Sequence, residues 1–357
     1  MAFYGYPNTR IRGMKSRLFS SNYFDQLLEA RDISEIIANL SKTDYKVDLE
    51  RGLVKHPGTM GVEEGLKLHI VREYQRILVY IKGNRQAERL IALLLSRWDV
   101  HNLKTIFRGI HSEAPREEIA DQLVPVGQLD LAYLNTLMDQ TDIKACIDLL
   151  AMWSFPVARP LTEVYSEYVN TQKLSTLELV IDRYHYQQML VNTRRFTLSR
   201  LNEKMVREFV KKEVDFTNIM TLFRLIRENI KDEDINYADF FIGGGKELDV
   251  ERMVSLTEEP EVEDVVEKLK DTSYYGVLRE GLKKFHFTGA LSSLERKIED
   301  HIIKQLVGMF KDDPLSIAII IAYIWAVFNE TVNLRIILRS KDVEMPEDQI
   351  REALVLV

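Results

Sequence analysis

The chain contains 357 residues and carries 48 lysines and arginines against 55 aspartates and glutamates, which gives a net charge of −7 at pH 7. This length suits more than one domain of ordinary size, and the acidic balance argues against a general nucleic-acid binder, which normally presents a basic face. The single cysteine, Cys146, excludes an intrachain disulfide and is typical of a reducing compartment. Its neighbours in DIKACIDLL predict a small core residue rather than a reactive thiol.

The first element in chain order is the basic segment YGYPNTRIRGMKSRLFS, residues 4–20. Two interpretations of it stay open. One is an amphipathic helix with a solvated basic face, and the other is a contact with an acidic partner or an anionic membrane surface. The candidate interface residues are Arg10, Arg12, Lys15 and Arg17.

Three stretches follow the pattern acid-x-x-Asn-x-x-x-x-x-Arg at nearly constant intervals. The second acid follows the first by 116 residues, and the third follows the second by 115. Apolar residues after each asparagine recur at the spacing of one helix face. A fixed period predicts one helical unit used three times. The motif residues are Asp99, Asn102 and Arg108; Asp215, Asn218 and Arg224; and Glu330, Asn333 and Arg339.

A second block supports the same period. RDISEIIANLSKTDY (31–45), TDIKACIDLLAMWSF (141–155) and PEVEDVVEKLKDTSY (260–274) share an acid at position two, leucine at ten and an aromatic residue at fifteen. A third block pairs LSTLELVIDRY (174–184) with LSSLERKIEDH (291–301). We expect its looser counterpart in the first module to begin at Gly61.

Glycine and proline are sparse, and strand-like alternation is rare. The sequence therefore predicts an all-α protein of three similar helical modules, with boundaries near residues 118 and 236. The predicted modules are 1–118, 119–235 and 236–357.

The motif spacing bears on its chemistry. On one helix the acid and the asparagine share a face, whereas the arginine lies about 180° around the axis from the acid. We therefore interpret the acid and asparagine as residues that fix local helix packing, and the arginine as one that reaches a neighbouring module or a partner. Catalysis would require an acid and a base that converge on one pocket, and the spacing argues against this. Gly109, directly after Arg108, predicts a helix end.

Other candidate sites are weak. The run from Gly243 to Lys246 lacks the first glycine and the Ser/Thr of a phosphate-binding loop, and we interpret it as a turn before a helix that begins near Asp249. The apolar run from Leu315 to Phe328 is shorter than the roughly 20 residues that cross a bilayer. Asp313 and Pro314 predict that a buried helix begins there. The histidines show no ligand spacing, which argues against a metal site, and Ser and Cys lie in no nucleophile motif. We therefore expect no catalytic residue, metal, cofactor or small-molecule substrate.

YGYPNTRIRGMKSRLFS, LSKTDY and SRWDVHNLKTIFRG resemble the C subunit of archaeal-type (A/V-type) rotary ATPases, the counterpart of the d subunit of eukaryotic V-ATPases. The likeness spans the chain, because the three motifs fall where the three-fold repeat of that family places them. DVHNLKTIFRG (99–109) is the most specific element. DFTNIMTLFRL (215–225) departs most, so the second module is expected to face its surroundings differently.

The resemblance implies a funnel-shaped protein whose three modules surround a pseudo-three-fold axis. It also implies a non-catalytic rotor adaptor, peripheral on the cytoplasmic face of the cell membrane. Such an adaptor binds the proteolipid ring and the central-stalk subunits, and it transmits torque for ion transport or ATP synthesis. The alternative from another class is a helical-repeat scaffold that binds a soluble protein. An all-helical enzyme ranks third, because no motif supports it.

Overall fold

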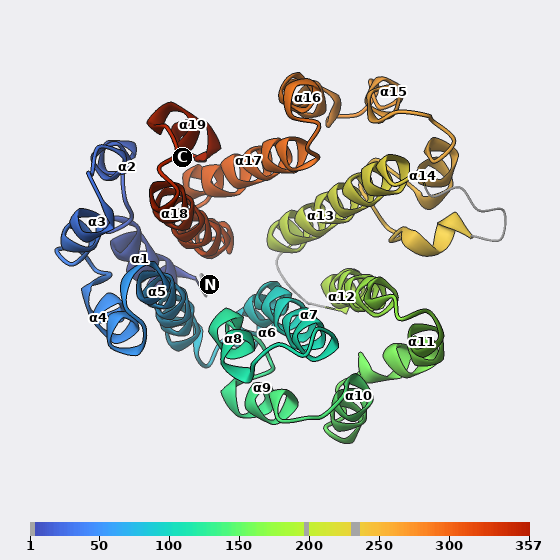
Figure 1. Cartoon of the computed structure of the whole chain (residues 1–357), viewed down its shortest axis with the longest axis horizontal. Coiled ribbons are helices and arrows are strands. Elements are labelled where there is room, and N and C mark those ends of the chain that lie inside the picture. The colour runs from blue at the N-terminus through green and yellow to red at the C-terminus, as the bar shows by residue number, and fades with distance from the viewer. Residues whose placement is uncertain (1–3, 196–199, 230–235) are drawn as a thin grey trace. The chain divides into compact units, whose positions relative to one another are not determined.

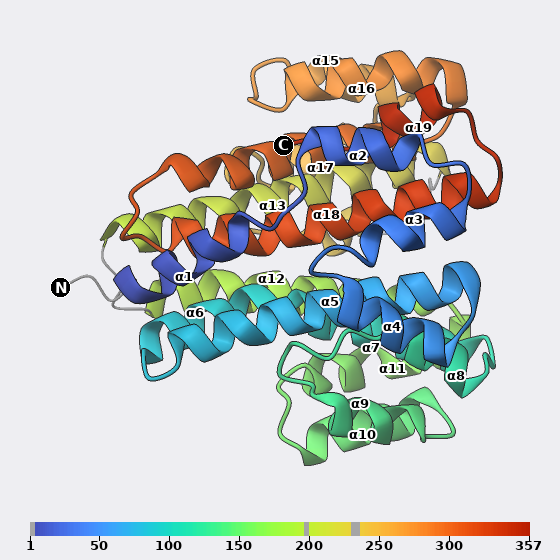
Figure 2. The same ribbon diagram turned by 90° about the vertical axis from the view of Figure 1, so that its left-hand side faces the viewer.

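The computed structural model describes residues 4–195, 200–229 and 236–357. Within these residues the secondary structure is α-helical, with two short 3-10 helices and no strand, so the all-α prediction is confirmed (Figures 1 and 2). The helices are α1 (Gly5–Lys15), α2 (Ser21–Leu28), α3 (Ile33–Leu40), α4 (Lys46–Lys55), α5 (Gly58–Ile81), α6 (Arg85–Leu95), α7 (Arg97–His111), α8 (Arg116–Gln122), α9 (Leu131–Met138), α10 (Ile143–Met152), α11 (Ala158–Thr171), α12 (Leu174–Arg195), α13 (Arg200–Arg227), η1 (Tyr237–Phe240), α14 (Val250–Leu256), α15 (Val262–Lys268), α16 (Tyr275–Thr288), α17 (Ser292–Gly308), η2 (Met309–Lys311), α18 (Ala318–Asp342) and α19 (Glu347–Ala353).

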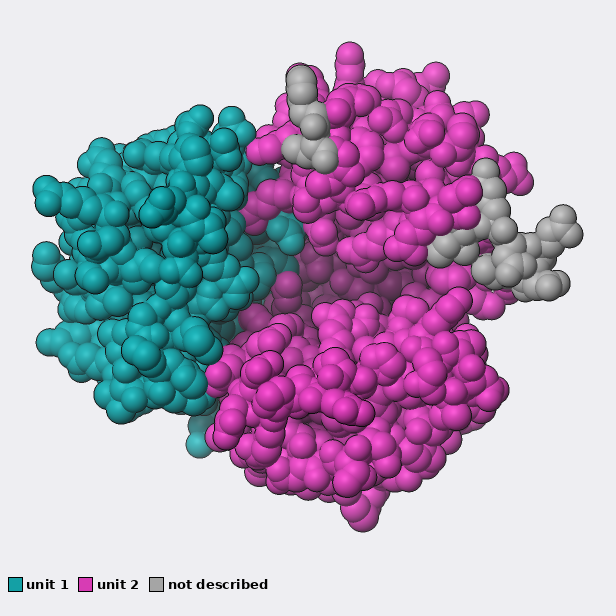
Figure 3. All heavy atoms as spheres, in the orientation of Figure 1, with its two compact units in different colours: residues 1–89, 299–357 teal, residues 90–298 magenta. Residues whose placement is uncertain are grey.

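The chain divides into two compact units, which Figure 3 colours separately. Unit 1 comprises residues 1–89 and 299–357, so it combines the N-terminal helices with α18 and α19. Unit 2 comprises residues 90–298. The division into three modules remains a prediction.

In unit 1, α4 and α5 pack at very short range because glycines line their contact. A Cβ atom on Gly52 would lie 2.1 Å from the carbonyl oxygen of Gly61, and one on Gly61 would lie 2.0 Å from that of His56. Any side chain at these positions would therefore force the two helices apart. This close packing orients α5, whose Tyr74 hydroxyl donates a 3.0 Å hydrogen bond to the carbonyl of Ile324 in α18.

Helix α18 is the core helix of unit 1. Every residue from 317 to 327 is buried, and Figure 2 shows α18 (red) beside α1 (dark blue), with which it is in contact. Among the described residues it is the one helix long and apolar enough to cross a membrane, yet 78% of its apolar window is buried inside the protein. The prediction of a helix buried within protein is confirmed.

The predicted start of this helix was wrong. The helix begins at Ala318, not directly after Asp313 and Pro314. The Asp313 carboxylate accepts a hydrogen bond from the backbone N–H of Leu315, and the Asp313 carbonyl accepts one from that of Ser316. These bonds form a turn that precedes the helix.

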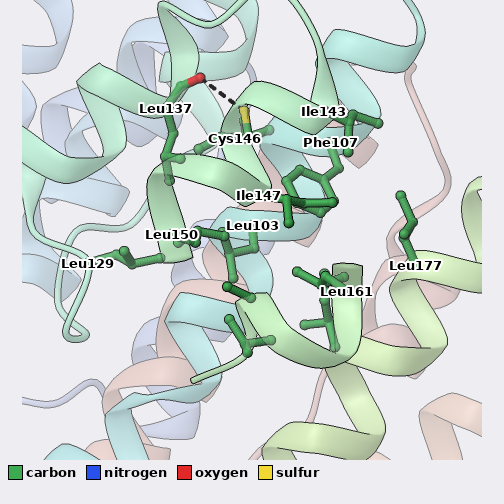
Figure 4. Close-up of a cluster of buried hydrophobic side chains, with 14 of the residues drawn as sticks. Leu103, Phe107, Leu129, Leu137, Ile143, Cys146, Ile147, Leu150, Leu161 and Leu177 are labelled. Atoms are coloured by element: carbon green, nitrogen blue, oxygen red, sulfur yellow. Dashed lines mark hydrogen bonds between the residues drawn. The ribbon is translucent and has the colours of Figure 1, made fainter. Parts of the chain in front are cut away.

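In unit 2, one hydrophobic cluster extends from α7 to α12 (Figure 4). Leu103 and Phe107 of α7 meet Ile147 and Leu150 of α10, and all four side chains are buried. Cys146 is also fully buried, and its Sγ lies 3.4 Å from the carbonyl oxygen of Leu137. Burial raises the pKa of this thiol to about 12, so the prediction of an inert core cysteine is confirmed.

Candidate functional site: three acid–Asn–Arg joints

The three predicted motifs lie on the long helices α7, α13 and α18. On α7 and α13 the motif binds a later segment of the chain, and on α18 it binds segments near both the N-terminus and the C-terminus of the chain. We call these contact sets the first, second and third joint. In each joint an acid, an asparagine and an arginine follow in the same order along the motif helix.

The asparagine of each motif is fully buried and forms two hydrogen bonds with the backbone of a single residue. Its amide NH2 donates to that residue's carbonyl, and its Oδ1 accepts from that residue's N–H, with distances of 2.8 to 3.0 Å. A short amide side chain can satisfy both groups at once. The pairs are Asn102 with Val124, Asn218 with Ile242, and Asn333 with Val355.

In the first two joints the acid binds the loop that follows the asparagine's partner. The Asp99 carboxylate accepts hydrogen bonds from the backbone N–H groups of Gln128 and Leu129, at 2.9 and 2.8 Å. The Asp215 carboxylate accepts three, from residues 246, 247 and 248, at 3.0, 2.8 and 3.3 Å. Each carboxylate thus holds the chain just before the next helix, α9 or α14.

In the third joint, the N-terminal part of the chain supplies this contact. The Glu330 carboxylate accepts a 2.5 Å hydrogen bond from the N–H of Phe19, two residues before α2 begins, and a 2.8 Å bond from the Tyr45 hydroxyl. The acid of the last motif therefore binds the N-terminal part of the chain. The acids of the first two motifs bind the segment just before the next helix along the chain.

Burial raises the pKa of all three acids. That of Asp99 rises to about 6 and that of Glu330 to about 7, because desolvation outweighs the hydrogen bonds they accept. The pKa of Asp215 is also raised by burial, against the effect of its three backbone donors and Tyr274.

The aromatic residue at position fifteen of the second block belongs to the joints. The Tyr274 hydroxyl donates to Asp215 at 2.8 Å, as Tyr45 donates to Glu330. The first joint has Phe155 at this position, which has no hydroxyl to donate. The sequence displayed this repeated aromatic residue but did not indicate its partner.

A glycine lies directly before the loop donors of the first two joints. A Cβ atom on Gly127 would lie 2.1 Å from Asp99 Oδ1, and one on Gly245 would lie 1.9 Å from Asp215 Oδ1. The run from Gly243 to Lys246 is therefore part of a carboxylate-binding turn. The following helix α14 begins at Val250 with Asp249 as its N-cap, which confirms the predicted helix start near Asp249.

The arginine of each motif pairs with a glutamate near the start of a long helix. Arg108 and Arg339 each donate two hydrogen bonds, at 2.5 and 2.9 Å, whereas Arg224 makes one contact at 3.4 Å. The second joint thus has the weakest ion pair. The partners are Glu178 in α12, Glu295 in α17 and Glu63 in α5.

Sequence reasoning missed these glutamates, although a signal was present. Glu178 and Glu295 both occupy position five of the third block. Glu63 reaches that position only if the first-module counterpart begins at Thr59, two residues before the predicted start at Gly61.

All three motif helices end alike. Five residues after each arginine lies a non-glycine residue with positive φ: Glu113 (52°), Asn229 (46°) and Glu344 (53°). This left-handed residue ends a helix by bonding its last carbonyls. The predicted end at Gly109 was wrong, because α7 continues to His111. Gly109 instead permits close packing, since a Cβ there would lie 2.4 Å from the Ile119 side chain.

The candidate interface cations lie apart from the arginines of the joints, on or just after α1. All four are exposed, and α1 forms with its basic side solvated. Arg10 lies 5.2 Å over the Tyr80 ring, Lys15 lies 4.1 Å over the Phe310 ring, and Arg17 is 3.6 Å from Asp44. In the described part of the chain, no group of His, Cys, Asp and Glu could hold a metal ion.

The fold and the joints define an all-α protein in which one set of contacts, made by an acid, a buried asparagine and an exposed arginine, recurs three times. The family model described as "ATP synthase (C/AC39) subunit" matches residues 7–353, and the chain belongs to this family. This confirms the predicted family, whose members serve as a membrane-associated ATP synthase subunit that is not itself an enzyme.

Curated relatives agree over almost their whole length. The chain is 29% identical to the C subunit of the A-type ATP synthase of Methanococcoides burtonii, covering 99% of this chain and 94% of that protein. It is 28% identical to that of Methanosarcina acetivorans, covering 99% and 93%. It is 27% identical to that of Haloferax volcanii, covering 99% and 97%.

Proposed function

We propose that this chain is the non-catalytic adaptor of a rotary A/V-type ATP synthase. It binds the proteolipid ring on the cytoplasmic face of the membrane and receives the tip of the central stalk. Its three modules surround a pseudo-three-fold axis, and the depression between them is the socket of the stalk. The adaptor transmits torque between the two partners for ion transport or ATP synthesis.

The third joint is the observation that carries this proposal. Arg339, Glu330 and Asn333 lie in the last predicted module, yet the first two bind Glu63 and Phe19 in the first module. The first and second joints likewise connect each module to the next. A succession in which the last module binds the first supports a closed arrangement.

The physical character of the joints also supports a part that carries torque. In each joint, a fully buried asparagine donates one hydrogen bond to the backbone of a single residue and accepts another from it. Breaking these bonds would leave buried backbone groups without partners, which costs free energy. A chain fastened in this way resists local opening better than modules on flexible linkers.

The test is a binding experiment with the purified full chain. The chain is mixed separately with detergent-solubilised proteolipid ring and with purified central-stalk subunits, and then with both together. We expect binding to each and a ternary complex. A folded, helical chain that binds neither would contradict the proposal and favour a scaffold for a soluble partner.

A further inference from the structure

Helix α1 presents an exposed side that the joints do not use. Its buried side is formed by Pro7, Asn8, Ile11 and Met14, and the Asn8 amide donates to the carbonyls of Pro314 and Ser316 at 2.7 and 2.8 Å. These bonds fix the helix on the turn before α18. The opposite, exposed side begins with Tyr6 and continues with three small residues, Thr9, Gly13 and Ser16, which we call the α1 crown.

The crown is smooth because its hydroxyl groups bond to their own helix. Thr9 Oγ1 donates to the carbonyl of Gly5, and Ser16 Oγ donates to that of Gly13, both at 2.9 Å. A Cβ atom added at Gly13 would meet no atom within 4 Å. Another chain could therefore approach the helix backbone closely at this point.

Cations flank the crown on both sides, two of them held by aromatic rings. Arg10 lies over Tyr80 on one flank, where Tyr6 meets the same ring edge-on at 6.4 Å. On the other flank Lys15 lies over Phe310, and Arg12 is exposed. A cation held over a ring loses less conformational freedom on binding than a free one.

The charge of this face contrasts with that of the protein. Helix α1 contains no acidic residue between Gly5 and Lys15, whereas the whole chain carries a net charge of −7. Charge complementarity therefore selects an acidic partner for this face. A bilayer surface is disfavoured, because membrane-binding helices insert several large apolar side chains, whereas the one large apolar side chain exposed on α1 is Tyr6, whose ring packs edge-on against Tyr80.

We infer that the α1 crown and its flanking cations dock an acidic protein segment at close range. This inference rests on the proposed function, because the partner is then another component of the ATP synthase. It assigns one face of unit 1 to that contact, through Arg10, Arg12 and Lys15 for charge and through Gly13 for close approach.

The test uses the full chain and two independent changes to the face. The double variant Arg10→Glu, Arg12→Glu reverses the charge, and Gly13→Leu blocks close approach without a clash inside the protein. The matched controls are Arg159→Glu, whose side chain is 88% exposed, and Gly276→Leu, where a Cβ also meets nothing within 4 Å. Affinity for solubilised proteolipid ring, central-stalk subunits and anionic phospholipid vesicles is measured for each protein.

We expect both crown variants to lose about tenfold or more in affinity for one protein partner, with affinity for the other partner unchanged, both controls binding as the wild type does, and no variant lowering the melting temperature. If both crown variants bound both partners with wild-type affinity, this inference would be overturned and the proposed function would stand. Loss of vesicle binding without loss of partner binding would overturn it in favour of a lipid contact. If the wild-type chain bound neither partner, the proposed function would fail, and the inference with it.

Discussion

Arg339 and Glu63 are 276 residues apart in the sequence, and their side chains form a two-point ion pair with N–O distances of 2.5 and 2.9 Å. The pair joins the C-terminal motif helix α18 to α5 within unit 1. It repeats the geometry of Arg108 with Glu178 in unit 2. The same contact therefore forms once between α7 and α12, 70 residues apart, and once between α18 and α5, 276 residues apart.

This pairing predicts unequal coupling at the joints. A double-mutant cycle with Arg339→Ala and Glu63→Ala should give a coupling energy of about 0.5–1 kcal/mol, as for well-aligned exposed pairs. The same cycle at Arg224 and Glu295 should give less, because the contact is single and 3.4 Å long. Chemical denaturation supplies the four stabilities of each cycle. Equal coupling at both joints would show that the two-point geometry adds nothing.

Removing the side chain of a joint asparagine should destabilise the protein far more than removing that of an exposed arginine outside the joints. Asn218→Ala leaves the buried N–H and carbonyl of Ile242 without partners. We expect a loss of about 2–4 kcal/mol in the free energy of unfolding. Arg159→Ala on the surface of α11 serves as the control and should change stability by less than about 0.5 kcal/mol. A loss below about 1 kcal/mol for Asn218→Ala would mean that water replaces the amide.

The buried tyrosine of the second joint can be compared with its sequence neighbour. Tyr274→Phe removes a hydrogen bond to buried Asp215 and should cost about 1.5–3 kcal/mol. Tyr275→Phe removes a bond to Glu267 at the surface and should cost much less. The unfolding free energies of both variants are to be measured by urea denaturation at about pH 7. A similar cost for the two variants would argue against a structural role for the Tyr274 hydroxyl.

The glycine before the Asp215 turn should not tolerate a methyl group. In Gly245→Ala, the new Cβ would lie 1.9 Å from Asp215 Oδ1 and 2.5 Å from the Leu248 carbonyl, so the turn must open. We expect a loss of about 2 kcal/mol or more in unfolding free energy. Gly276→Ala lies in helix α16 in open space and should stabilise slightly, because alanine favours helices. Thermal melts of both variants separate the steric effect from the propensity effect.

The third joint should make stability depend on pH. Burial raises the pKa of Glu330 in the folded protein from an ordinary value near 4.5 to about 7. Between these values the folded state binds more protons than the unfolded state, so the contribution of Glu330 to stability is greatest below about pH 4.5 and falls as pH rises toward 7. The full difference corresponds to roughly 3 kcal/mol.

The Glu330→Gln variant cannot ionise at this position, so its stability should fall less steeply over the same range. The measurement is the unfolding free energy of both proteins at several pH values between about 4.5 and 7.5. Parallel curves for the two proteins would show that Glu330 titrates normally in the fold.

Much of the fold followed from patterns local in sequence. The three motif helices, the helix start near Asp249 and the buried Cys146 were predictable, because helix periodicity and helix starts depend on residues a few positions apart. The wrong helix end at Gly109 shows the limit of such rules. That glycine serves a contact with Ile119, which no local pattern reveals.

The sequence by itself determined the residue types and the period of the joints, because repeated asparagines, acids and aromatic residues are visible in a single chain. Only the tertiary structure decided their partners. The carboxylates and amides bind backbone groups, which every residue carries and which leave no signature in sequence. The third joint also joins residues far apart in the chain, such as Glu330 with Phe19, 311 positions away, and Arg339 with Glu63. Packing of the helices, rather than spacing along the chain, brings those groups within hydrogen-bond distance.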